Sequence, residues 1–189
     1  APDVHPPPLH YMVRSGEAVD SQVSMDFIGM VFHGYYVTHM DSLAHIFWDG
    51  HMYNGLPASL VTSSEGATVE SIELMKNGVL ARGVLVDVPF IRGVDWMEPG
   101  DSVMPEDILA AEDKCGFAIE EGDVLLVRTG HTKRRQVKGP WDIKEHGQAA
   151  CQAACLPLLH ERRIAILGGD TGNDVMPYIY SKPYNPIHK

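Results

Sequence analysis

The chain has 189 residues, 44% of them hydrophobic, and a formal net charge of −10 at pH 7. This length suits one sizeable core, so we expect a single domain over residues 1–189. The negative charge, with no basic run longer than Lys133–Arg135, argues against binding to a nucleic-acid backbone. No apolar stretch approaches the length of a membrane span, so we expect no membrane-spanning segment.

The three cysteines are an odd number, which indicates reduced thiols rather than a disulfide framework. Cys151 and Cys155 stand at helical spacing among small residues, and we expect both thiols to pack in the core. Reduced cysteines are typical of a cytoplasmic protein, and that is the location we expect.

Both ends of the chain have the composition of loops. Residues 1–10 contain four prolines, which predicts an extended arm without regular structure. Residues 181–188 resemble a loop that no further element follows. From these two ends we expect the domain to be incomplete on both sides.

Between the ends, predicted strands and helices alternate. Beta-branched and aromatic residues predict a buried strand over 23–32, and proline with early acidic residues predicts a helix beginning at Pro105. The other expected elements are a short helix over 69–77 capped by Gly78, a buried strand over 79–88, a strand over 122–128, a helix over 145–162 and a strand over 163–167. This alternation predicts an α/β domain with helices packed against a central sheet.

A glycine-rich turn, residues 168–174, follows the last predicted strand. The carboxyl end of a strand is where open α/β sheets place ligands, so the turn could line a site. It could equally be a tight turn that uses glycine for positive φ. No lysine follows it, which argues against a phosphate-binding loop.

Histidines gather around one aspartate in the first third of the chain. His39, Asp41 and His45 fall within seven positions, with His33 and His51 just outside. Imidazole nitrogen and carboxylate oxygen are ligands that zinc and manganese prefer, and three protein ligands with an open position are typical of a catalytic metal. The spacing therefore predicts a catalytic metal site.

The local conformation decides whether these side chains can converge. On an extended chain the odd-numbered residues share a face, so His33, Tyr35, His39, Asp41 and His45 could point the same way. On a helix, positions 39 and 41 would lie about 200° apart, so the metal site requires strand or loop. The alternative is a set of ordinary polar histidines, although an aspartate buried there would be costly without a cation.

The segment Thr38–His45 resembles the His-x-Gly-Thr-His-x-Asp-x-Pro-x-His signature of the cyclase family of metal-dependent hydrolases. Kynurenine formamidase, an enzyme of tryptophan catabolism, isatin hydrolase and a dienelactone hydrolase belong to that family. The resemblance runs from about His33 to the end of the chain. It includes three further segments, which are residues 47–55, 122–130 and 166–170.

The resemblance implies a swivelling β/β/α fold with a central mixed sheet, usually in a homo-oligomer, and a bound zinc or manganese ion. His39 and Asp41 fall on metal ligands of the family. His45 falls on the residue that accepts and donates protons. The family's later ligand histidine corresponds to His188.

The chain also departs from the signature. Tyr35 stands where the family has its first ligand histidine, and Val37 and Leu43 stand where it has glycine and proline. His33, two residues before Tyr35 and with the same side-chain parity, could take the ligand role. Tyr35 could instead coordinate as a phenolate, or the metal could bind weakly.

From the resemblance we expect hydrolysis of a C–N amide bond, in an aryl formamide or a cyclic amide, by a metal-activated water. The substrate would be a small aromatic amide or lactone, and Phe47, Trp48 and Tyr53 would either form an aromatic wall for it or pack in the core. Two alternatives stay open. One is a lactone or ester hydrolase of the same family, and the other is a catalytically silent metal- or ligand-binding protein.

Overall fold

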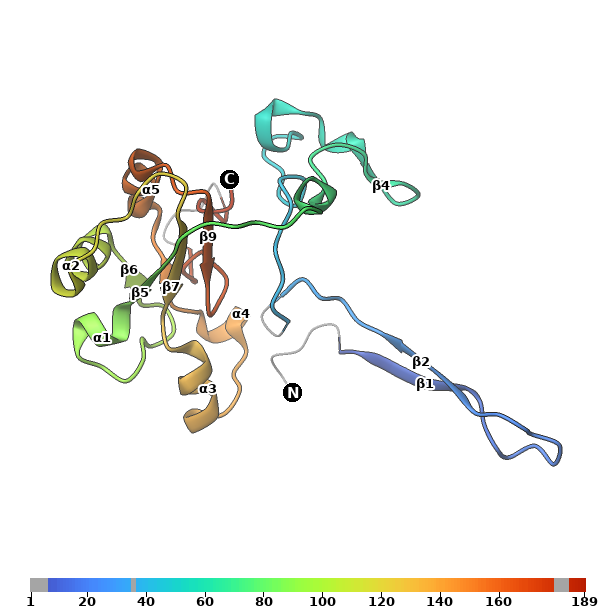
Figure 1. Ribbon diagram of the computed structural model, residues 1–189. Coiled ribbons are helices and arrows are strands. Elements are labelled where there is room, and N and C mark those ends of the chain that lie inside the picture. The colour runs from blue at the N-terminus through green and yellow to red at the C-terminus, as the bar shows by residue number, and fades with distance from the viewer. Residues whose placement is uncertain (1–6, 35–36, 179–183) are drawn as a thin grey trace. The chain divides into compact units, whose positions relative to one another are not determined.

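The computed structural model describes residues 7–34, 37–178 and 184–189. The chain divides into two compact units, residues 1–39 and residues 40–189, and each has its own architecture. Helices are present together with parallel and antiparallel strand pairs, so the fold is mixed α/β, as predicted (Figure 1).

A three-stranded parallel sheet is the centre of the second unit. Strands β5 (Gly83–Asp87), β7 (Val124–Arg128) and β9 (Ile166–Gly169) pair in that order. Alternate side chains face opposite sides of a strand, and here one side is buried, with Val86 and Leu125 fully inaccessible. The strands expected over 79–88, 122–128 and 163–167 are thus confirmed, each shorter than predicted or shifted by a few residues.

Helices pack on the buried side of this sheet. Helices α1 (Val88–Arg92), α2 (Pro105–Cys115) and α5 (Leu156–Arg162) gather there (Figure 1) and contribute Val88, Ile108 and Leu159 to the hydrophobic core. Helix α2 begins at Pro105 as expected, because proline fits the first turn and the Asp107 carboxylate accepts a hydrogen bond from the Met104 amide at 2.8 Å.

The remaining elements of the second unit are short. Strands β6 (Ser102–Val103) and β8 (Ala150–Cys151) pair in parallel, and β3 (Val61–Thr62) and β4 (Gly66–Ala67) pair antiparallel. The other helices are α3 (His131–Lys138), α4 (Ile143–His146) and the 3-10 turns η1 (Tyr53–Gly55), η2 (Ala58–Leu60), η3 (Ile72–Met75) and η4 (Ala153–Cys155).

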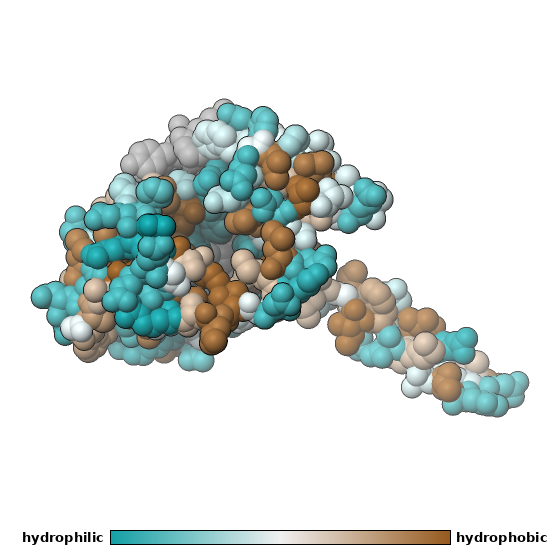
Figure 2. Space-filling view, turned by 45° about the horizontal axis from the view of Figure 1, so that its top comes forward, coloured by the Kyte–Doolittle hydropathy of each residue, from teal (hydrophilic) through white to brown (hydrophobic). Residues whose placement is uncertain are grey.

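The first unit contains an antiparallel hairpin of β1 (Leu9–Arg14) and β2 (Met25–Gly29). Tyr11 stacks on Phe27 with ring centroids 5.1 Å apart, yet both remain exposed. Apolar side chains lie at the surface of the hairpin (Figure 2). The strand expected over 23–32 exists in part but is not buried, because β2 pairs with β1 alone among the residues that the structure describes. The prediction of no regular structure in residues 1–10 is wrong for Leu9 and His10.

The prediction of a helix over 145–162 is wrong. The segment instead contains the end of α4, then β8, η4 and α5. Gly147 has a φ of 80° and approaches another segment so closely that a Cβ there would lie 2.1 Å from the Met176 carbonyl oxygen. The chain then runs as a strand beside β6 before it turns into α5. Cys151 and Cys155 pack in the core as expected, although not on one helix face.

The helix expected over 69–77 is reduced to the 3-10 turn η3, and Gly78 closes it with a φ of 79°. The parallel and antiparallel pairs lie in separate sheets, so the single central mixed sheet expected from the resemblance is not found among the described residues. The swivelling arrangement and the single domain stay predictions. Within those residues, no helix combines the length and apolarity that crossing a membrane requires.

Candidate metal centre

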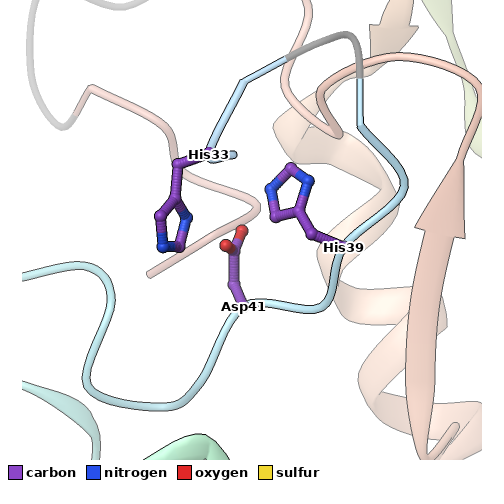
Figure 3. Close-up of side chains that lie close together, drawn as sticks. All are labelled: His33, His39 and Asp41. Atoms are coloured by element: carbon purple, nitrogen blue, oxygen red, sulfur yellow. The ribbon is translucent and has the colours of Figure 1, made fainter. Parts of the chain in front are cut away.

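Three predicted metal ligands come together from one short stretch of the chain, residues 33–41. His33, His39 and Asp41 each offer a ligand atom, and these atoms lie within 4.8 Å of one another. Figure 3 shows the Asp41 carboxylate between the two imidazole rings. The described part of this stretch contains no helix or strand, which agrees with the requirement for strand or loop.

Neighbouring groups fix the orientation of both rings. The His39 Nδ1 lies 2.7 Å from the Val37 carbonyl oxygen. A carbonyl can only accept a hydrogen bond, so Nδ1 donates the proton and Nε2 is the nitrogen with a lone pair. His33 stacks on Phe32 with ring centroids 4.5 Å apart, and the two imidazole rings are nearly perpendicular at 76°.

The donor set fits a divalent metal ion. Zinc binds nitrogen and oxygen at about 2.0–2.2 Å, so two ligands at tetrahedral positions lie about 3.4 Å apart. Donor atoms spread over no more than 4.8 Å can therefore reach one ion with small side-chain adjustments. Two imidazoles and one carboxylate also leave coordination positions for water or a substrate, as catalytic sites require.

His45 lies beside this group. Its Nε2 is 3.7 Å from Asp41 Oδ1, and its side chain is about one-third exposed, at 32%. A short turn precedes it, in which the His45 amide donates to the Ser42 carbonyl at 3.0 Å. The imidazole therefore has access to solvent next to a predicted ligand.

His188 lies in a different environment from the other predicted ligands. Among the described residues, the group of possible ligands consists of His33, His39 and Asp41 and does not include His188. Its Nδ1 is hydrogen-bonded to the carboxylate of Asp174, which is almost completely buried. This hydrogen bond raises the pKa of His188, burial lowers it, and the nearby charges of Asp174 and Asp41 raise it further, for a net increase.

The other sequence candidates are placed as follows. Tyr35 lies outside the described residues. Asp49 and Gly50 form a tight turn, with φ values of 46° and 75°, and Trp48 and His51 exchange two backbone hydrogen bonds across it. Phe47, Trp48 and Tyr53 are all exposed, so they are not core residues.

The glycine-rich turn after β9 carries a structural carboxylate. Asp170 accepts hydrogen bonds from the Thr129 amide and hydroxyl and from the Gly130 and His131 amides, at 2.7–3.0 Å. It joins the ends of β7 and β9 to the start of α3. The Cys151 thiol is buried, and its hydrogen bond with Cys155 together with this burial holds its pKa well above the usual value.

Sequence reasoning missed Asp174. Its partners Ile187 and His188 are more than ten positions away, so no local spacing connects them. The one available signal was an acidic residue at the end of the glycine-rich turn 168–174, and that signal does not identify a partner.

Comparison with known proteins assigns the chain to a protein family. The sequence model of the cyclase family matches residues 8–173. A crystal structure described as a novel cyclase superposes with a TM-score of 0.72 at 26% identity and covers 98% of this chain. Isatin hydrolase A from Labrenzia aggregata, bound to benzyl benzoate, superposes with a TM-score of 0.61 at 22% identity and covers 96% of this chain.

The chain spans 64% of the length of each of these two solved structures. The search of curated proteins gave no match. The family match covers most of the chain, including the loop with His33, His39 and Asp41. The family expected from the signature is thus confirmed, and the chain belongs to the cyclase family.

Proposed function

We propose that the protein is a metal-dependent hydrolase that cleaves a C–N amide bond, in an aryl formamide or a cyclic amide, with water as the nucleophile. The main support is the convergence of His33, His39 and Asp41 in a chain that belongs to the cyclase family. A carboxylate placed between two imidazoles is a donor set that suits a divalent ion.

In this proposal His33, His39 and Asp41 hold a zinc or manganese ion together with His188. His33 takes the role that the family signature gives to the position of Tyr35. When bound, such an ion supplies Lewis acidity, which makes water a stronger nucleophile at neutral pH and polarises a carbonyl group. The Val37 carbonyl accepts a hydrogen bond from Nδ1 of His39 and so fixes the tautomer of the ring. Its Nε2 is then the nitrogen with a lone pair that can bind the ion.

His45 is the proposed general base and acid. An imidazole ordinarily titrates near neutral pH, so it can take a proton from water and return it to the leaving nitrogen. Its Nε2 lies 3.7 Å from Asp41 Oδ1, close enough to act at the same centre, and its partial exposure gives water access.

The proposed substrate is a small aromatic amide. Phe47, Trp48 and Tyr53 are exposed in the segment that follows the signature, where they can contact a flat ring. The structure of isatin hydrolase A contains benzyl benzoate, an aromatic ester, and water activation serves esters as well as amides. A lactone or ester hydrolase is therefore the second candidate. We also propose that the protein is cytoplasmic and forms a homo-oligomer. Light scattering on the purified protein tests the oligomeric state.

The test combines metal analysis with hydrolysis assays on the purified protein. We expect about one or two equivalents of zinc or manganese and turnover of an aryl formamide or cyclic amide. Asp41→Asn should lose the metal and lower the hydrolysis rate by at least about 100-fold, because the ion generates the nucleophile. Asp49→Asn is the matched control, since Asp49 is exposed in a turn where asparagine tolerates positive φ.

The outcomes separate the candidates. Turnover of lactones or esters but not amides would assign the second candidate. Tight metal binding without turnover on either panel would indicate a silent binding protein. A folded protein with neither metal nor turnover would overturn the proposal.

A further inference from the structure

Asp174 is a buried carboxylate with two defined partners in the last described segment of the chain. The residue is 3% exposed. Its Oδ1 accepts a hydrogen bond from the Ile187 amide at 2.8 Å, and its Oδ2 faces Nδ1 of His188. One carboxylate therefore fixes both the backbone and the side chain of the segment that carries His188.

The position of Asp174 is itself fixed by the core. Its backbone pairs with Cys151 of β8, and its carbonyl accepts a hydrogen bond from the buried Gln148 side chain at 2.8 Å. The next amide, that of Val175, donates to the Cys151 carbonyl at 3.1 Å. The carboxylate is therefore presented from a backbone segment that is hydrogen-bonded to β8 and to Gln148.

The contact determines which nitrogen of His188 carries a proton. An ionised carboxylate only accepts hydrogen bonds, so Nδ1 must donate and Nε2 is the nitrogen with a lone pair in the neutral ring. The Val37 carbonyl imposes the same tautomer on His39. Two predicted ligands thus share one arrangement, which is typical of metal-binding histidines held by an oxygen acceptor.

We propose that Asp174 is a positioning residue of the metal centre, which holds Nδ1–H of His188 and so makes Nε2 the nitrogen offered to the ion. This inference rests on the proposed function, because it takes His188 as a ligand. His188 is taken as a ligand because it corresponds to the later ligand histidine of the family that the chain belongs to. A carboxylate behind a ligand imidazole also increases the basicity of the ring and strengthens the metal bond.

Asp174→Asn is the decisive substitution. The asparagine oxygen can still accept the Ile187 amide, but its NH₂ group would donate to Nδ1 and move the ring proton to Nε2, which blocks metal binding. We expect the dissociation constant for zinc, measured by competition with a chelating dye on the full chain, to rise about 10–100-fold. His188→Ala should weaken binding similarly. Asp174→Asn should then have no further effect in the His188→Ala background.

Asp123→Asn is the matched control. Asp123 is also 3% exposed, and its hydrogen bond with Arg82, together with that from the Glu120 amide, lowers the pKa of its carboxyl to about 2. This substitution should lower the stability of the fold and leave zinc affinity unchanged. Nitrogen NMR of the metal-free protein at alkaline pH adds a test without Asp174 variants. His188, identified by comparison with His188→Ala, should carry its proton on Nδ1.

The failures are distinguishable. If the wild-type protein binds no zinc or manganese, the proposed function fails. If it binds metal and His188→Ala binds equally well, or Asp174→Asn weakens binding in the His188→Ala background too, the positioning role is wrong and the metal centre stands. A proton on Nε2 in the wild-type protein would also overturn the positioning role.

Discussion

The parallel sheet β5–β7–β9 and the hairpin β1–β2 are built from similar residues but bury them very differently. Val86 and Leu125 of the sheet are 0% exposed, whereas Tyr11 and Phe27 of the hairpin are 55% and 43% exposed. Helices cover one side of the sheet, while in the described part of the chain each hairpin strand pairs with the other strand alone. Apolar residues therefore form strands in both places, but only the sheet is covered by helices. Packing against such a layer is what makes paired strands stable.

The largest expected effect is in the sheet. Leu125→Ala should lower the free energy of unfolding by about 2–5 kcal/mol, because it leaves a cavity at a fully buried position in the central strand. Urea unfolding followed by circular dichroism measures this loss. Leu126→Ala is the control, since Leu126 is the next residue in β7 but is 42% exposed. Equal losses at both positions would contradict the assignment of a buried and an exposed side of the sheet.

A smaller effect is expected at the turn that ties the strands together. Asp170→Asn should cost about 1–3 kcal/mol, because the amide NH₂ group cannot accept the hydrogen bonds that Gly130 and His131 donate to one carboxylate oxygen. Thermal unfolding measures the loss. Asp95→Asn, which removes an exposed ion pair with Lys133, should change stability by no more than about 0.5 kcal/mol.

The smallest effect is expected in the hairpin. Phe27→Ala should change the free energy of unfolding of the sheet unit by less than about 0.5 kcal/mol, because Phe27 is exposed and stacks only on Tyr11 among the described rings. Hydrogen exchange of the β5, β7 and β9 amides, compared with wild type, resolves such a change. A loss above about 1 kcal/mol would mean that another surface covers the hairpin in solution.

Local signals predicted part of the fold. Pro105 and Asp107 defined the start of α2, and apolar runs located β5 and β7, because these features act within a few residues of chain. The helix predicted over the alanine-rich segment 145–162 is not found, for the opposite reason. Its composition favours helix, but Gly147 and the pairing of Ala150–Cys151 with β6 depend on segments far away in sequence.

The candidate site was likewise predictable in part. Side-chain parity predicted that His33, His39 and Asp41 could converge, since all three lie in one short stretch, and the signature predicted the family. The roles of His33, His39, Asp41, His45 and His188 remain predictions. Asp174 could not be predicted, because a carboxylate that holds a histidine across the chain has no motif.

The absence of a side chain at position 147 has a consequence for which sequences this fold accepts. The Gln148 amide donates to the Met176 carbonyl at 2.9 Å, and any Cβ at Gly147 would collide with that same carbonyl. Even an alanine at position 147 would force its segment away from the segment of Met176. Asp174 lies two residues before Met176. A side chain at position 147 would therefore disturb the segment that holds Asp174, and through Asp174 a histidine 41 residues further along the chain.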